Sequence, residues 1–150
     1  FNLLFQNTVN TSMDAIKGMK ENNWGRIINM TSVSVKEPLA YLALSNTIRS
    51  AVTSWGKTLS IESGQFNITV NNILTGFFNT ERLNQLNSEK AKKFNVSTEE
   101  VFDKMSEMVP LKRIGEPEEF GYLVAFLASD YASYINGVNI PIDGGLLKSM

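Results

Sequence analysis

The sequence has no cysteine and no histidine among its 150 residues. Without these two side chains the chain cannot by itself form a thiolate nucleophile, a disulfide, a Cys/His zinc site or a Ser-His-Asp triad. Its longest uninterrupted apolar run covers only residues 122–128, which is far shorter than a membrane-spanning helix. We therefore expect no metal site, no triad-type hydrolase and no segment embedded in a membrane.

An excess of positive charge is also lacking. The chain has 14 Lys+Arg and 15 Asp+Glu, a formal net charge of -1, and no dense cluster of basic residues. Proteins that bind nucleic acids concentrate positive charge to neutralise phosphates, so we expect no nucleic-acid partner. The first residues also lack the pattern of a secretory signal. These features predict a soluble, cytoplasmic protein with one globular domain.

Two short segments rich in β-branched residues flank a long helical pattern. Residues 26–30 and 68–73 are predicted to be strands. Between them, apolar residues recur every three or four positions over residues 42–63, which is typical of a helix with one buried face; they are Leu44, Ile48, Val52, Trp55 and Leu59. A strand, a long helix and a second strand favour a parallel sheet covered by helices, and therefore an α/β fold.

The remaining segments fit the same alternation. Residues 1–20 are compatible with a helix, and residues 75–109 are so highly charged that we expect them outside the core, with a short helix beginning after the capping-box sequence at Ser97. A helix is predicted to begin at Pro117, because proline is favoured in a first helical turn. Residues 137–142 are predicted to be the last strand, which Pro141 restricts to an edge or a strand end.

Five stretches, in order and in spacing, resemble the short-chain dehydrogenase/reductase family over nearly the whole chain. They are GRIINMTS at 25–32, ITVNNILTG at 68–76, PLKRIGEPEE at 110–119, FLASD at 126–130 and GVNIPIDGG at 137–145. The resemblance implies a Rossmann-like, doubly wound parallel sheet. No glycine-rich G-x-G-x-x-G turn occurs, so residues 1–150 resemble only the C-terminal portion, a single partial domain without the dinucleotide-binding half.

The resemblance implies hydride transfer between NAD or NADP and a small-molecule alcohol or carbonyl substrate. In the family, a Ser polarises the substrate, a Tyr donates the proton, and a Lys four residues later lowers the pKa of the Tyr and binds the ribose. These positions correspond here to Ser32, Ser45 and Arg49. The position of an upstream helix Asn that completes a proton relay falls near Leu4. An aliphatic hydroxyl is a much weaker acid than a phenol, so the active site is atypical.

Further residues complete the candidate site. Tyr41 lies one turn before Ser45 and can supply a phenol from a displaced position; alternatively, it only caps the helix. Arg49 retains a positive charge that can bind ribose hydroxyls, and a solvated or interface charge is the alternative. The resemblance implies that Thr75, Gly76 and Thr80 lie against the nicotinamide.

Two further expectations follow from the resemblance. The altered catalytic positions leave open a catalytically inactive binding or scaffolding protein, a pseudoenzyme, as the alternative to an active oxidoreductase. Members of the family commonly assemble, and the helix at residues 42–63 carries more apolar surface than one sheet face needs. We therefore expect a homodimer or homotetramer.

Overall fold

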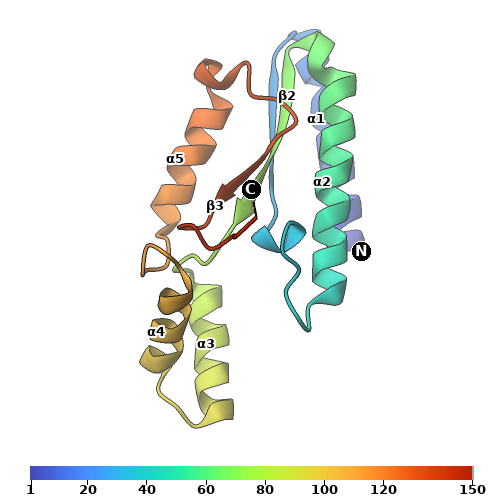
Figure 1. Ribbon diagram of the computed structural model, residues 1–150. Coiled ribbons are helices and arrows are strands. Elements are labelled where there is room, and N and C mark those ends of the chain that lie inside the picture. The colour runs from blue at the N-terminus through green and yellow to red at the C-terminus, as the bar shows by residue number, and fades with distance from the viewer. Residues whose placement is uncertain (150) are drawn as a thin grey trace.

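The computed structural model describes residues 1–149, which form a three-stranded parallel sheet with helices on both faces (Figure 1). The strands are β1 (Gly25–Met30), β2 (Ile68–Thr75) and β3 (Asn139–Ile142), in the order β1-β2-β3. The helices are α1 (Asn7–Glu21), α2 (Ala43–Ser63), α3 (Glu81–Phe94), α4 (Thr98–Met108) and α5 (Pro117–Ala128). Short helical turns are η1 (Asn2–Gln6), η2 (Val33–Val35), η3 (Gly64–Phe66) and η4 (Asp130–Ala132). The expected α/β fold and parallel sheet are confirmed.

The sheet is covered on both faces because successive strand residues point to opposite sides. Helices α1 and α2 cover one face, and α5 covers the other (Figure 1). The core under α1 and α2 contains Ile16, Ile27, Leu59 and Val70. The core under α5 contains Ile73, Leu127 and Ala132, with Phe120, Leu123 and Val124 packed against it. The helix predicted to begin at Pro117 is therefore confirmed, and these apolar side chains form its buried side.

The predicted strands and the long helix occur within two residues of their expected bounds, and Pro141 lies in β3, at one edge of the sheet that residues 1–149 form. Ser97 caps α4 as expected, because its side-chain oxygen accepts a hydrogen bond of 3.0 Å from the amide of Glu100. Helix α3 was not predicted. It packs mainly on α4 beyond the carboxyl ends of the strands, and the high charge of its segment hid its apolar spacing (Figure 1).

Three asparagine side chains cross the sheet in one row, which we call the amide ladder: Asn29, Asn72 and Asn139. The amide nitrogen of Asn29 donates to Asn72 Oδ1 at 3.0 Å, and that of Asn72 donates to Asn139 Oδ1 at 2.8 Å. Asn72 is completely buried, so these bonds satisfy groups that water cannot reach. Gly56 of α2 lies directly over the row, and a Cβ there would approach Asn72 Oδ1 to 2.9 Å. The close approach of α2 to the sheet therefore requires glycine.

The first turn of α5 is held by one carboxylate. Glu119 accepts a hydrogen bond of 2.8 Å from the amide of Glu116, and two bonds of 2.7 Å from the guanidinium of Arg113. The bidentate bonds from Arg113, followed by the backbone bond, lower the pKa of Glu119 from 4.5 to about 2. Because the folded-state pKa lies below the unfolded value, this stabilisation is present above about pH 4.5 and is lost as the pH falls towards about 2.

We expect Glu119→Gln to lower the midpoint of thermal unfolding at pH 7, and the difference from the natural chain to disappear as the pH falls towards about 2. Thermal melts followed by circular dichroism over this range measure the effect. The matched control is Glu118→Gln, because Glu118 is exposed in the same helical turn and forms no ion pair within residues 1–149. A difference between the natural chain and Glu119→Gln that persists at pH 2 would contradict this account.

Within residues 1–149, no helix combines the length and the hydropathy needed to cross a bilayer.

Candidate active site

A cavity of about 440 Å³ lies at the carboxyl ends of β1 and β2, and we call it the strand-end cavity. Parallel sheets of α/β proteins commonly bind ligands at this edge, where the strand ends leave a crevice. Met30, Thr75 and Gly76 bring the strand ends to it, and α2, α3 and α5 supply the remaining walls. The other lining residues are Ser32, Val33, Leu39, Arg49, Phe77, Phe78, Thr80, Arg82, Leu83, Leu86, Pro117 and Phe120.

Ser32 follows β1 in extended backbone and begins η2. Its Oγ accepts a hydrogen bond of 3.1 Å from the amide of Ser34. A hydroxyl has one donor hydrogen in addition to its acceptor sites, so this capping bond does not use the hydrogen. The half-buried hydroxyl can therefore donate to a carbonyl or hydroxyl oxygen in the strand-end cavity.

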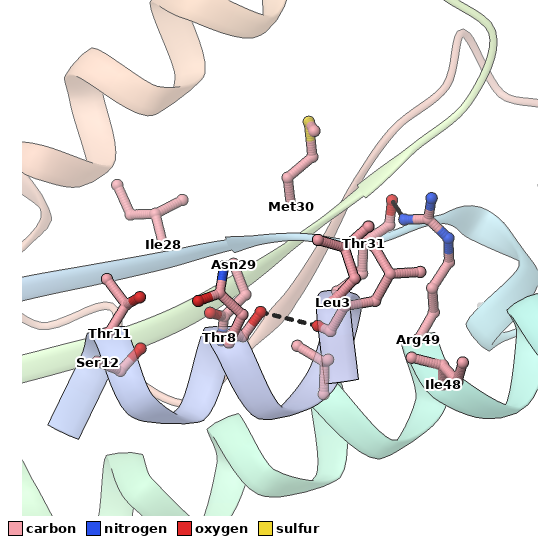
Figure 2. Close-up of a pocket in the computed structure, with 13 residues that line it drawn as sticks. Leu3, Thr8, Thr11, Ser12, Ile28, Asn29, Met30, Thr31, Ile48 and Arg49 are labelled. Carbon is pink, nitrogen blue, oxygen red and sulfur yellow. Dashed lines mark hydrogen bonds between the residues drawn. The ribbon is translucent and has the colours of Figure 1, made fainter. Parts of the chain in front are cut away.

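Arg49 reaches the cavity from α2 and is anchored by one bond. Its Nη1 donates to the backbone oxygen of Thr31 at 3.0 Å (Figure 2). The hydroxyl of Thr75 donates to the same oxygen, also at 3.0 Å. This shared acceptor joins α2 to the ends of both strands. A guanidinium has five N–H donors, so the anchored Arg49 still presents donors and a permanent positive charge to a ligand.

A second cavity, of about 350 Å³, lies between α1, β1 and α2, and Figure 2 shows it with Arg49 and Thr31 at one end. Arg49 and Met30 line both cavities, so these two side chains lie where the cavities meet. Leu4 lines the second cavity beside Arg49. Its aliphatic side chain has no group that could pass a proton, so the relay position expected at Leu4 is apolar in the structure as well as in the sequence.

Two predicted residues lie outside the strand-end cavity. Tyr41 is fully exposed, and its backbone is left-handed, with φ of 64°. Ser45 is half-buried in the first turn of α2 and is not among the residues lining the cavity. The structure thus brings together Ser32 and Arg49, but neither Ser45 nor Tyr41 joins them. The catalytic roles of Ser45 and Tyr41 stay predictions that this geometry does not support.

The residues expected at the nicotinamide do line the cavity. Thr75 ends β2 and Gly76 follows it, and the Gly76 amide donates to the carbonyl of Ile142 at 3.0 Å. A Cβ on Gly76 would approach the Cα of Asp143 to 2.8 Å, so glycine is needed for this contact. Thr80 caps α3, where its Oγ1 accepts from the Leu83 amide at 3.3 Å. Its hydroxyl hydrogen remains available to a ligand.

Sequence reasoning missed the apolar wall and one cation. Phe78 and Phe120 meet edge to face with ring centroids 6.0 Å apart, and Leu83 and Leu86 extend this wall along α3. Arg82 also lines the cavity from the first turn of α3. The signal that could have found them is the spacing of Arg82, Leu83 and Leu86, because residues three and four positions apart lie close together in a helix. Arg49 and Arg82 are the only charged residues lining this cavity within the described residues.

The chain is similar to proteins of known family. A family model described as enoyl-(acyl carrier protein) reductase matches residues 2–147. The NADPH-dependent reductase BacG of Bacillus subtilis is 39% identical over 142 residues, which are 92% of this chain and 55% of that protein. The 3-oxoacyl-[acyl-carrier-protein] reductase FabG of Rickettsia conorii is 34% identical over 134 residues, 89% of this chain and 51% of that protein. The chain thus spans about half the length of the curated relatives it matches.

Solved structures show the same similarity. A short chain dehydrogenase family protein from Francisella tularensis superposes with a TM-score of 0.84 at 28% identity, over 93% of this chain and 58% of that one. L-sorbose reductase from Gluconobacter frateurii, complexed with NADPH and L-sorbose, gives a TM-score of 0.85 at 31% identity, over 90% of this chain and 52% of that one.

Proposed function

The chain belongs to the short-chain dehydrogenase/reductase family, and from this premise we propose that its protein is an oxidoreductase acting on an alcohol or carbonyl compound with NAD or NADP. The observation that carries the proposal is the meeting of Ser32, Arg49, Thr75, Gly76 and Thr80 on one cavity at the strand ends. BacG is an NADPH-dependent reductase, and L-sorbose reductase is complexed with NADPH in its crystal structure, so NADPH is the first cofactor to test.

The rim of the strand-end cavity fits the nicotinamide end of such a cofactor. Arg49 offers free N–H donors for ribose hydroxyls, and Thr80 has an available hydroxyl hydrogen. Gly76 lines the same cavity at the end of β2, where it can contact the nicotinamide. When bound, the cofactor supplies or accepts the hydride.

The residues of this chain orient the substrate and stabilise charge. The Ser32 hydroxyl donates a hydrogen bond to the carbonyl oxygen, which draws electron density away from the carbonyl carbon. Arg49 places a permanent positive charge near the same oxygen, where negative charge develops during reduction. Phe78 and Phe120 keep one side of the cavity apolar, which strengthens both interactions by excluding water.

The test is oxidation of NADPH by the protein in its natural length, followed by absorbance, with a panel of ketones and aldehydes. Oxidation that depends on the carbonyl compound supports the proposal. Cofactor binding without turnover of any carbonyl or alcohol would contradict it and would instead indicate the pseudoenzyme.

We further propose that the protein assembles as a homodimer or homotetramer. Ile48 and Leu59 of α2 are buried within the chain, but Leu44 and Ile61 are 74% and 72% exposed. These exposed apolar side chains support an interface on the outer side of α2. Sedimentation velocity at micromolar concentration should give a dimer or tetramer, and a single monomeric species would contradict the assembly.

A further inference from the structure

The strand-end cavity combines an apolar wall with unpaired positive charge. Its wall is formed mainly by Phe77, Phe78, Leu83, Leu86 and Phe120. Such a surface binds aliphatic or aromatic groups, because contact removes apolar area from water. A small sugar or another strongly polar molecule would leave this wall poorly covered.

Arg82 gives the cavity its second cation. Arg82 is exposed and also lines the cavity, so the residue lies where the cavity opens to solvent. Arg82 forms no ion pair with any carboxylate in the part of the chain that the structure describes. Glu81 precedes Arg82 directly, but adjacent residues of a helix do not face each other, and no ion pair joins the two within residues 1–149. The residues one turn away on either side, Phe78, Asn79, Gln85 and Leu86, are uncharged.

The cavity wall also carries no acidic residue that could neutralise the two arginines. Its charged lining residues are Arg49 and Arg82, from α2 and α3. Arg49 is anchored on the Thr31 carbonyl beside Ser32, where the proposed function places the carbonyl oxygen of the substrate. Arg82 belongs to a different helix and is not needed for that step. Its charge is therefore available to a group of the ligand remote from the reacting carbon.

We infer that the strand-end cavity binds an apolar carbonyl compound that carries an anionic group, with Arg82 binding the anion. This inference rests on the proposed function and adds the substrate class to it. A guanidinium binds carboxylate and phosphate oxygens through two parallel hydrogen bonds, so both anions share the required chemistry. The nucleotide cofactor also carries phosphate groups, so it is a second source of an anion for Arg82. The apolar wall on α3 next to Arg82 favours the substrate as the source.

The experiment compares two ligands that differ only in charge, an oxo-octanoate and its methyl ester. Their affinities for the protein are measured by calorimetry without cofactor, so that the readout does not depend on turnover. We expect the acid to bind the natural protein at least tenfold more tightly than the ester. Arg82→Gln should weaken the acid roughly tenfold and change the ester less than twofold, because a hydrogen bond to a charged group contributes about this much.

Two further variants make the comparison specific. Lys90→Gln removes the same charge from an exposed position on α3 that does not line the cavity, and we expect no change in the affinity of the acid. Arg82→Lys keeps the charge without the planar fork, and we expect an intermediate affinity. Circular dichroism melts establish that each variant is folded.

Three results would overturn the inference. These are equal binding of acid and ester to the natural protein, equal loss of acid binding in Arg82→Gln and Lys90→Gln, and a loss of NADPH binding in Arg82→Gln as large as the loss of acid binding. The last result would assign Arg82 to the cofactor phosphates. Charge-dependent binding of the acid without NADPH oxidation would contradict only the proposed function. Oxidation with neutral ketones but no Arg82-dependent preference would contradict only the substrate class.

Discussion

Replacing Ser32 with alanine is expected to lower kcat/KM for carbonyl reduction by about 100-fold, the loss typical when a single donor to a developing oxyanion is removed. The hydroxyl lies at the end of β1 and lines the strand-end cavity, and its hydrogen is not used by the capping bond from the Ser34 amide. The neighbouring hydroxyl of Thr75 cannot replace it, because its hydrogen is bonded to the Thr31 carbonyl. Steady-state kinetics of the natural-length protein with NADPH measure the effect.

The same substitution also removes the cap of η2, so stability must be measured separately. A lost cap costs about 1 kcal/mol and appears as a lower unfolding midpoint without a specific loss of turnover. Ser32→Thr retains the hydroxyl and should recover most of the activity. Ser54→Ala is the matched control, because Ser54 is an exposed serine of α2 away from the cavity. Unchanged kcat/KM in Ser32→Ala would refute the role of this hydroxyl.

Ser45→Tyr is expected to raise kcat at least tenfold, within the range that a positioned general acid contributes. Ser45 lies one helical turn before Arg49, so both side chains leave the same face of α2. Arg49 lines the cavity, whereas Ser45 does not. A tyrosine at this position extends towards the same rim, and its phenol, with an unperturbed pKa of about 10, is a far better proton donor than an aliphatic alcohol.

Ser45→Phe separates the effect of the proton-donating hydroxyl from the effect of the aromatic ring. Ser45→Phe adds the same aromatic volume without a hydroxyl, so it should leave kcat close to that of the natural protein. Initial rates of NADPH oxidation under saturating carbonyl substrate compare the three proteins. An equal gain in Ser45→Tyr and Ser45→Phe would mean that packing, not proton donation, limits the rate at this position.

The elements with strong apolar periodicity could be predicted from the sequence. Helix α2 and strands β1 and β2 occur as expected, since Ile48, Val52 and Leu59 of the helical stripe are buried against the sheet. Leu44, which belongs to the same predicted stripe, is exposed because it lies in the first turn of α2. Helix α3 was missed because its segment is highly charged, although its apolar residues recur at helical spacing; its packing against α4 uses polar contacts as well as apolar ones. Asn87 is completely buried there and donates to the sulfur of Met105 at 3.2 Å, a contact that no hydropathy pattern indicates.

The candidate site was also predictable from the sequence only in part. Ser32, Arg49, Thr75, Gly76 and Thr80 line one cavity, and the roles that the family resemblance implies for them stay predictions. Sequence spacing could not reveal that Ser45 does not line this cavity, since spacing gives the face of a helix but not which side chains reach a cavity. The backbone of Tyr41 is left-handed, a conformation uncommon outside glycine and asparagine that its neighbours in the sequence did not indicate.

Arg82 and the apolar wall depend on contacts between segments far apart in the chain. Phe78 meets Phe120 across more than forty positions, and only the folded arrangement places Pro117 and Phe120 opposite α3. The charged segment at 75–109 lies largely outside the core, as its composition predicts. Its inner side nevertheless provides the walls of the site.

The amide ladder also fixes the register of the three strands, and with it the relative positions of the strand ends. Asn29, Asn72 and Asn139 occupy matched positions on the three strands, and a slip of one residue along β2 would turn Asn72 to the opposite face. A slip of two residues would set Val70 or Leu74 against Asn29 and leave buried amides without partners, at about 1–3 kcal/mol for each orphaned group. The amide ladder in the middle of the sheet thereby keeps Ser32 and Thr75 in register at the strand ends. The Ser32 hydroxyl and the Thr31 carbonyl, which accepts the hydrogen bond from Arg49, therefore stay in one fixed arrangement beside the ligand.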